Sequence, residues 1–123
     1  MKEQLWIAVA SLSGTLAVVF GAFAAHALRA RLTAEQLVTW NIAVHYHLVH
    51  SVVLLALALY AAASTRSTAL PSAFFAAGIL LFSGSLYGLL LTGQGWLGPL
   101  TPLGGFCLVG GWLSLLVLAV REG

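Results

Sequence analysis

Charged residues are scarce in this chain of 123 residues, because Asp, Glu, Lys and Arg together make up only 7% of it. Soluble domains carry about 25% of these residues. The hydrophobic share is 61%, so the sequence predicts an integral membrane protein. The five Lys and Arg residues are scattered and form no basic patch of the kind that nucleic-acid binding needs. We therefore expect the lipid bilayer as a partner and exclude nucleic acid.

Cysteine and carboxylates are also few. Cys107 is the only cysteine, which excludes an intramolecular disulfide, dithiol redox chemistry and a cysteine-based metal site. The chain has three carboxylates, and only Glu35 lies near the histidines in the sequence. A Ser-His-acid triad needs a carboxylate that orients the histidine. We therefore expect no enzymatic activity, no catalytic residues and no cofactor.

Long hydrophobic runs are abundant, and four of them stand at residues 5–28, 41–63, 71–91 and 102–120. A helix needs about 20 apolar residues to cross a hydrocarbon core about 30 Å thick. The connecting loops are too short to form domains of their own, at residues 29–40, 64–70 and 92–101. The predicted fold class is all-α, a bundle of four transmembrane helices that forms a single domain over residues 1–123.

The second segment is predicted to become helical before it enters the bilayer. Thr33 and Gln36 have the spacing of a capping box, which predicts a helix start near Ala34. Leu37 and Trp40 follow in the first turns. We therefore expect an interfacial amphipathic turn before the second transmembrane helix.

Two other segments have a proline near their start. Pro71 and Pro102 each suit the first position of a helix, and Thr101 is predicted to cap the fourth helix. Tryptophan is typical of the membrane–water interface. We therefore expect the four tryptophans to be interfacial anchors or lipid-facing side chains.

An even number of spans puts both termini on one side of the membrane. The basic residues on that side are Lys2, Arg66 and Arg121, against Arg29 and Arg31 on the other side. Because basic residues favour the cytoplasmic side, both termini are predicted to be cytoplasmic. Abundant Ala, Leu and Gly and the preference for arginine over lysine suggest a bacterial source. The expected location is the bacterial cytoplasmic (inner) membrane, crossed by a multi-pass protein.

Small residues follow one face of three of the segments. Glycine lets helix backbones approach closely, which is one way that helices associate in lipid. We therefore expect helix packing at Gly14, Gly21, Gly84, Gly88, Gly104 and Gly111. Small-residue surface that the bundle itself leaves over would suit contacts between copies, so a homo-oligomer is predicted.

Three histidines stand close together in the second segment. His47 and His50 share a helical face, whereas His45 points about 200° away from His47. If the bilayer began only after His50, residues 51–63 would span about 20 Å, which is too short. His47 and His50 are therefore predicted at membrane depth, where ionisable side chains indicate function.

Polar residues of the first three segments are expected to converge in one half of the membrane. The predicted polar intramembrane site consists of His26, Tyr46, His50, Ser83, Ser85 and Tyr87. Three interpretations are open: interhelical hydrogen bonds that hold the bundle together, a cavity for protons or a small ligand of unknown identity, and a metal site. The metal candidates are weak, because no carboxylate accompanies His26, His47 and His50. We therefore expect no metal.

Four ordered motifs resemble those of one known family. They are GAFAAHAL at residues 21–28, YHLVH at 46–50, LFSGSLYGLLLTG at 81–93 and LGPLTPLGGFCLVGGW at 97–112. Together they are similar to the small four-helix membrane proteins of domain of unknown function 423, a family that includes transmembrane protein 256 of animals. The resemblance implies a four-helix fold in bacterial inner or mitochondrial membranes, without an established biochemical activity.

The family pattern matches this chain at His26, Tyr46, His50, Ser83, Gly84, Ser85, Tyr87, Pro102, Gly104 and Gly105. The chain departs from the pattern at Ala24, where glycine is usual, and at His47, where glutamine is common. The second departure implies that His47 is not a required metal ligand across the family.

The predicted function is that of a small structural or accessory membrane protein. The alternative is a transporter or channel-like protein that handles protons or a small ligand through a polar cavity around His26, Tyr46, His50 and Tyr87. A cavity that reaches His50 would favour the alternative, whereas histidines paired with protein groups would count against it.

Overall fold

The computed structural model describes residues 2–122, apart from the side chains of Ala25 and Glu122. All regular structure within this range is helical, and four helices are long and apolar enough to cross a membrane. The predicted all-α bundle of four spans is therefore confirmed. The elements are α1 (Lys2–Phe23), η1 (Ala24–Leu28), α2 (Ala34–Ala63), α3 (Ala69–Gly78), η2 (Ile79–Gly84), α4 (Ser85–Thr92), η3 (Gly95–Leu97) and α5 (Leu100–Glu122).

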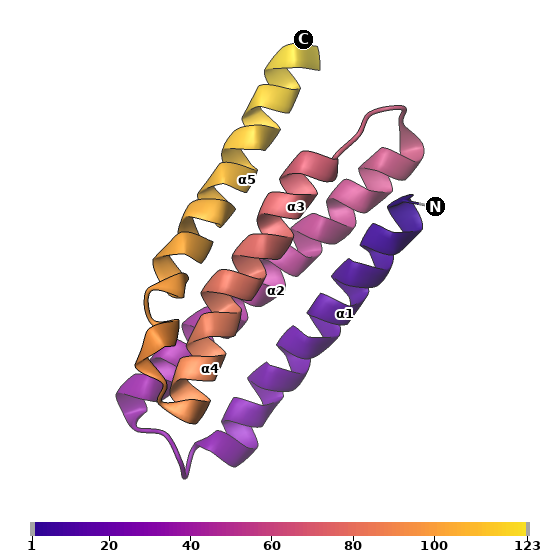
Figure 1. The fold of residues 1–123 in the computed structure, drawn as a ribbon. Helices are drawn as coiled ribbons and strands as arrows, with labels where there is room; N and C mark the ends of the chain where they lie inside the picture. The colour runs from indigo at the N-terminus through magenta and orange to yellow at the C-terminus, as the bar shows by residue number, and fades with distance from the viewer. Residues whose placement is uncertain (1, 123) are drawn as a thin grey trace.

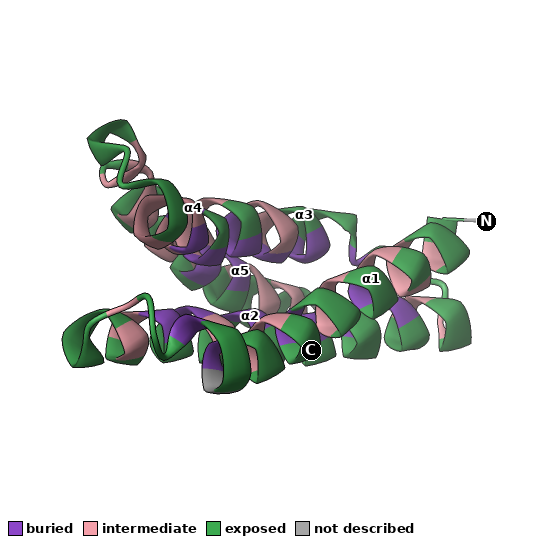
Figure 2. Ribbon diagram, turned by 90° about the horizontal axis from the view of Figure 1, so that it is seen from below, coloured by how far each residue is buried: buried purple, intermediate pink, exposed green. Residues whose placement is uncertain are grey.

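The four spans run up and down, with both termini at the same end of the molecule (Figure 1). The first span, α1 with η1, packs on α2, and α5 packs on the third span, which joins α3, η2 and α4. α1 and α5 therefore lie on opposite sides of the central pair of spans (Figure 1). Figure 2 shows the buried residues turned inward and the exposed ones outward. Exposed apolar side chains on the outside suit a bundle that is surrounded by lipid.

The start of α2 confirms the predicted capping box. Thr33 Oγ1 accepts from the backbone N–H of Gln36 at 3.1 Å, and the backbone N–H of Thr33 donates to Gln36 Oε1 at 2.9 Å. The two side chains satisfy backbone groups that a helix start leaves without intrahelical partners. α2 accordingly begins at Ala34.

The prolines and Thr101 lie differently from the prediction. α3 begins at Ala69 and α5 begins at Leu100, so Pro71 and Pro102 are each the third residue of a helix. Proline is tolerated there because the N–H groups of the first turn have no partner within the helix. Thr101 lies inside α5 rather than capping it, and its hydroxyl hydrogen-bonds Ser85 Oγ at 2.6 Å.

Trp40 also differs from the prediction. It was expected to anchor at the interface or to face lipid, but its side chain is fully buried, with 0% exposed. Its indole N–H donates to the carbonyl oxygen of Phe20 at 2.9 Å. The second turn of α2 already packs on the first span, so this face of the helix turns away from lipid. Trp96 and Trp112 are exposed, as predicted for lipid-facing side chains.

Two spans contain a short π-helical segment. η1 ends the first span, and η2 lies in the third span between α3 and α4. π turns bond residues five apart in place of four, and they are frequent at functional sites. η2 carries Ser83, one of the residues predicted for the polar site, whose hydroxyl bonds the backbone of α2.

Glycines bring α5 against the third span. A Cβ added at Gly104 would overlap the backbone of Phe82, and one at Gly111 would lie 2.7 Å from the ring of Phe75. Gly78, which was not among the predicted packing glycines, meets Leu108 in the same way, and a Cβ there would lie 3.1 Å from the Leu108 backbone nitrogen. Helix backbones therefore approach as closely here as the predicted glycine packing requires.

The other glycines that were expected to pack differ in how closely a neighbouring side chain or backbone approaches them. Gly14 and Gly21 face α2, and added Cβ atoms would lie 4.0 Å from Ser51 and 3.3 Å from Val44. A Cβ at Gly88 would lie 2.9 Å from Leu97. Gly84 differs from the expected packing role, because it is exposed and an added Cβ would meet nothing nearer than the Ile79 carbonyl oxygen at 3.9 Å. Its face of the third span lines the groove described below.

Candidate functional site

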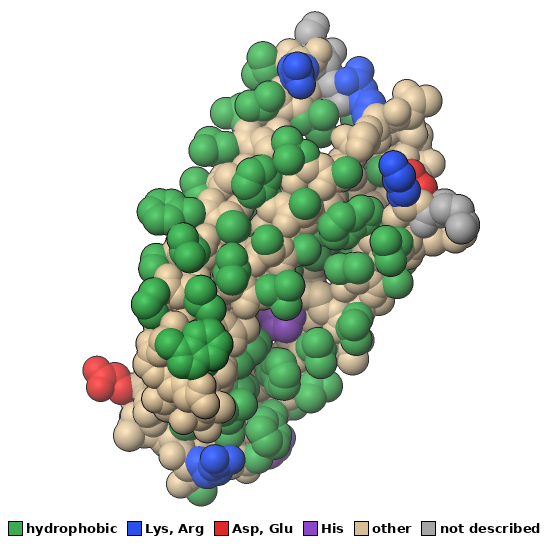
Figure 3. Space-filling model, viewed as in Figure 1, with side chains coloured by type: hydrophobic (Ala, Val, Ile, Leu, Met, Phe, Trp, Pro, Cys, Tyr) green, Lys and Arg blue, Asp and Glu red, His purple; other side chains and the backbone are tan. Residues whose placement is uncertain are grey.

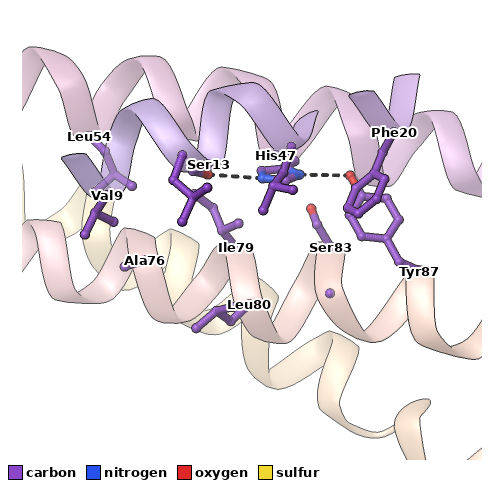
Figure 4. A pocket seen from close by; sticks show the side chains of 13 residues that line it. Val9, Ser13, Phe20, His47, Leu54, Ala76, Ile79, Leu80, Ser83 and Tyr87 are labelled. Atoms are coloured by element: carbon purple, nitrogen blue, oxygen red, sulfur yellow. Dashed lines mark hydrogen bonds between the residues drawn. The ribbon is translucent and has the colours of Figure 1, made fainter. Parts of the chain in front are cut away.

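His47, near the middle of α2, joins three helices through its two ring nitrogens. Its Nδ1 lies 3.0 Å from the hydroxyl of Tyr87 on α4, and its Nε2 lies 3.1 Å from Ser13 Oγ on α1 (Figure 4). Ser13 Oγ lies 2.6 Å from Ser51 Oγ, which donates at 2.7 Å to the carbonyl oxygen of His47. His47 is 4% exposed, so this hydrogen-bond chain is buried among the helices.

The positions of the protons in this chain of hydrogen bonds follow from the bond between Ser51 and the carbonyl oxygen of His47. Ser51 uses its only proton on a carbonyl oxygen, which can accept but not donate. Ser13 must then donate to Ser51, and the Nε2–H of His47 must donate to Ser13. The remaining ring nitrogen, Nδ1, contacts the hydroxyl of Tyr87, which can both donate and accept. The bonds therefore fix the Nε2–H tautomer of a neutral His47, in which Nδ1 accepts from Tyr87.

Aromatic rings surround the Tyr87 end of the chain. The ring centroid of Tyr87 lies 4.7 Å from that of Phe20 and 4.7 Å from that of Trp40. Phe20 and Trp40 also meet edge to face, with ring centroids 6.0 Å apart. Edge-to-face and offset contacts are the favoured arrangements of aromatic rings. The cluster fixes Tyr87 beside His47 by packing as well as by hydrogen bonding.

His50 forms a separate contact with α5. Its Nδ1–H donates to the carbonyl oxygen of Tyr46 at 2.7 Å, and its Nε2 accepts from the indole N–H of Trp112 at 3.1 Å. A carbonyl only accepts and an indole N–H only donates, so His50 is also neutral with a fixed tautomer. Both nitrogens are occupied by protein groups, which leaves no lone pair on the ring for a metal ion.

The histidines considered as weak metal candidates do not meet. His26 is exposed in η1, while His47 and His50 bond to different helices. Within residues 2–122, no group of three His, Cys, Asp or Glu side chains is placed to hold a metal ion.

The other residues of the predicted polar site are also dispersed. Ser83 Oγ donates to the carbonyl oxygen of Ala43 at 2.7 Å, which ties η2 to α2. Ser85 bonds Thr101 on α5, as described above. Tyr46 is 41% exposed, and its ring lies 4.7 Å from that of Phe82. The structure therefore brings Tyr87 to His47 and stacks Tyr46 on His50, with ring centroids 6.0 Å apart beside an open pocket of about 270 Å³, while His26 borders neither pair.

An apolar groove of about 280 Å³ runs beside the hydrogen-bond chain, between α1 and the third span (Figure 4). Carbon atoms dominate its wall, and the side chains of Leu12, Leu16, Ile79 and Leu80 contribute to it. His47, Ser13 and Tyr87 border the groove, but their polar atoms are bonded to one another. Figure 3 shows histidine atoms visible between hydrophobic side chains in the middle of this face.

Ser13, Ser51 and Trp112 were not predicted as partners of the histidines. Ser51 lies four residues after His47 and therefore shares its helical face, which is a signal that was present. Ser13 and Trp112 are distant in sequence, and only the rotation of the neighbouring helices brings them to α2.

Comparisons with known proteins bear on the whole chain. The profile of the family described as "Protein of unknown function (DUF423)" matches residues 20–105. The chain is 36% identical to the UPF0382 membrane protein YwdK of Bacillus subtilis over 120 residues, 96% of this chain and 98% of the relative. It is 37% identical to a UPF0382 membrane protein of Haemophilus influenzae over 94% of this chain and 92% of that protein.

A relative in a eukaryote is similarly close. The chain is 36% identical to a UPF0382 membrane protein of Schizosaccharomyces pombe, over 89% of this chain and 96% of the relative. No solved structure matches the chain.

Proposed function

The chain belongs to the DUF423 family of UPF0382 membrane proteins, and we propose that it is an accessory membrane protein without enzymatic activity that works as a homo-oligomer. The observation that carries the proposal is a polar face of α2 that is exposed at membrane depth. Asn41 and His45 are both exposed and lie four residues apart, on one face of the helix.

The depth of His45 makes this exposure costly. In the predicted span 41–63, His45 lies seven residues from the central residue, which at 1.5 Å per residue is about 10 Å and inside a hydrocarbon core about 30 Å thick. Ionisable side chains inside a membrane almost always face protein or water rather than lipid. Asparagine and histidine side chains also hydrogen-bond across helix interfaces in membranes. A second copy of the chain covering this face supplies such partners through a two-fold contact.

The absence of enzymatic activity is supported by the pairing of the interior polar groups. Among the buried side-chain N and O atoms of the described residues, only Ser72 Oγ has no hydrogen-bond partner. His47 and His50, the groups best suited to acid–base chemistry, use both nitrogens on protein groups. Such pairing favours a structural role for the polar interior.

Transport of protons or a small ligand is the weaker candidate. It would use a cavity around His26, Tyr46, His50 and Tyr87. Tyr46 and His50 stack with ring centroids 6.0 Å apart and border an open pocket of about 270 Å³, which favours this alternative. His26 and Tyr87 do not border that pocket, the groove beside Tyr87 is apolar, and both ring nitrogens of His50 are bonded to protein groups. Proton flux through liposomes that carry the protein tests this alternative. Flux above that of empty liposomes, lost in His47→Leu, would favour transport over our proposal.

We further propose that both termini lie in the cytoplasm of a bacterial cell, with the protein in the cytoplasmic membrane. Lys2, Arg66 and Arg121 lie at the end that carries both termini, against Arg29 and Arg31 at the other end. The positive-inside rule favours this orientation. A C-terminal tag is then expected to resist protease added to spheroplasts, and cleavage of the tag would reverse the orientation.

The oligomer is tested with the double variant Asn41→Leu, His45→Leu. We expect the wild type to sediment as a dimer or larger assembly in mild detergent, and the double variant to associate at least about tenfold more weakly, which corresponds to about 1.4 kcal/mol. Thr15→Leu is the matched control, because Thr15 is exposed on α1 and its hydroxyl bonds only its own helix, at 2.8 Å. A monomeric wild type, or equal association of all three proteins, would refute the proposal.

A further inference from the structure

A polar pocket of about 300 Å³ lies at the end of the molecule that carries both termini. Lys2 and Arg66 border it together with Glu3, and hydroxyl side chains of the loop between α2 and α3 complete its wall, namely Ser64, Thr65, Ser67 and Thr68. Figure 3 shows that most basic side chains visible on this face gather at this end. Two positive charges against one carboxylate leave the pocket with a net charge of +1.

The apolar groove begins directly below this pocket. On α1, Trp6 borders the polar pocket and Val9 borders the groove, one helical turn away. On α2, Ala58 borders the polar pocket and Leu54 borders the groove, again one turn away. The same faces of α1 and α2 therefore form first a basic, hydroxyl-rich wall and then a hydrocarbon wall.

The two sites together extend somewhat further than one leaflet of a bilayer. From Lys2 at the pocket to Phe20 at the far end of the groove, α1 rises about 27 Å at 1.5 Å per residue. A bilayer is about 40–45 Å thick with its headgroup regions, so one leaflet measures about 20–22 Å. The pocket thus lies at headgroup depth when the groove lies at acyl-chain depth.

We propose that α1, α2 and α3 together hold one phospholipid, with its phosphate beside Lys2 and Arg66 and one acyl chain in the groove. A phosphodiester carries one negative charge, which complements the net charge of the pocket. Lysine and arginine are the side chains that bind phosphate oxygens best, and the hydroxyl groups of Ser64, Thr65 and Ser67 can donate further hydrogen bonds, whereas Thr68 donates to the carbonyl oxygen of Leu57. The apolar groove wall then takes a hydrocarbon chain, while the hydrogen-bond chain of His47 stays closed behind it.

Gly84 provides a way to fill the groove without disturbing the bundle. It borders the groove, and an added Cβ would meet nothing within 3.9 Å except the Ile79 carbonyl oxygen at that distance. Gly84→Leu therefore occupies the acyl-chain position. Gly105 on α5 is the matched control, because it lies outside the groove and an added Cβ would also have its nearest contact at 3.9 Å, to the Phe82 ring.

The test is native mass spectrometry of the detergent-purified protein, titrated with dioleoyl phosphatidylglycerol or with dioleoyl glycerol, which has the same chains and no phosphate. We expect wild type and Gly105→Leu to retain the phospholipid at least fivefold more than the diacylglycerol. Gly84→Leu is expected to lower retention of both lipids at least fivefold. Lys2→Gln is expected to remove the preference for the phospholipid while retaining the diacylglycerol.

Helical circular dichroism of each variant shows whether it folds. Equal retention of the two lipids by the wild type would overturn the assignment of the headgroup pocket. Equal retention by a folded Gly84→Leu and the wild type would overturn the assignment of the groove. Neither result depends on Asn41 and His45, so the proposed oligomer is tested separately.

Discussion

α1 and α5 are held to the central spans by different means. α5 approaches α3 and η2 at glycines, and a Cβ at Gly104 or Gly111 would collide with the facing span. α1 is held to α2 by hydrogen bonds between side chains, with Ser13 of α1 and His47 of α2 at the centre. The indole N–H of Trp40 on α2 also donates to the α1 backbone, at the carbonyl oxygen of Phe20. Lipid does not drive apolar helices together, so close backbone packing and hydrogen bonding are the two available forces.

The two means leave different spaces behind. Glycine packing closes the interface between α5 and the third span. On the other side, α1 contacts α2 but leaves a groove of about 280 Å³ toward the third span. α5 in turn leaves an open pocket of about 270 Å³ toward α2, bordered by His50 and Trp112. The two outer helices therefore differ in how they are held rather than in whether they leave space beside them. The predictions below separate the two kinds of contact.

Gly104→Leu is expected to have the largest effect, because the new side chain would collide with the backbone of Phe82. Backbone cannot move aside as a flexible side chain does, so we expect a loss of more than about 3 kcal/mol. Unfolding in mixed detergent micelles, followed by circular dichroism, measures this loss. The adjacent Gly105→Leu should cost far less, and similar losses for both would show that α5 does not pack on η2 as described.

His47→Leu is expected to cost about 1–3 kcal/mol, because it breaks the bonds to Tyr87 and Ser13 and leaves their buried hydroxyls without this partner. The same unfolding assay applies. His47→Gln keeps one donor and one acceptor and should lose less than half as much. If glutamine destabilises as strongly as leucine, the hydrogen-bond chain does not hold α1 in place.

Trp112→Phe is expected to have the smallest effect, about 1 kcal/mol, because it removes one hydrogen bond to His50 and keeps most of the ring. Trp96→Phe is the control, since Trp96 is 64% exposed and bonds only the nearby Gln94. Tryptophan emission reports the folded state during the titration. Equal stability of both variants would mean that His50 does not need Trp112.

The sequence predicted the elements better than the contacts between them. Apolar runs revealed the four spans, and the spacing of Thr33 and Gln36 located the start of α2, because both signals are local. The polar site depends on the rotation of each helix about its own axis. His26 carries no local signal that it lies outside the bundle, and nothing near Tyr87 in the sequence points to His47.

In the family that the sequence resembles, glutamine is common at the position of His47, which argues against a metal-binding role for this residue. The same exchange is mild for a hydrogen-bonding role, because glutamine and neutral histidine each offer one acceptor and at least one N–H donor. The structure gives His47 that role, with one nitrogen donating and the other accepting. An exchange between glutamine and histidine at position 47 therefore argues against metal binding but is compatible with interhelical hydrogen bonding.

η2 sets the rotational phase of the third span. A π turn admits an extra residue, and each residue of an α-helix advances the chain by about 100° around its axis. α3 can thus present Gly78 to α5 while α4 presents Tyr87 to α2. If Ile79–Gly84 were wound as α-helix with all its residues, Tyr87 would turn about 100° away from His47, whereas deleting one residue would restore a continuous α-helix and keep the direction of Tyr87. The pairing of these two side chains therefore depends on the π turn between α3 and α4 as much as on their identity.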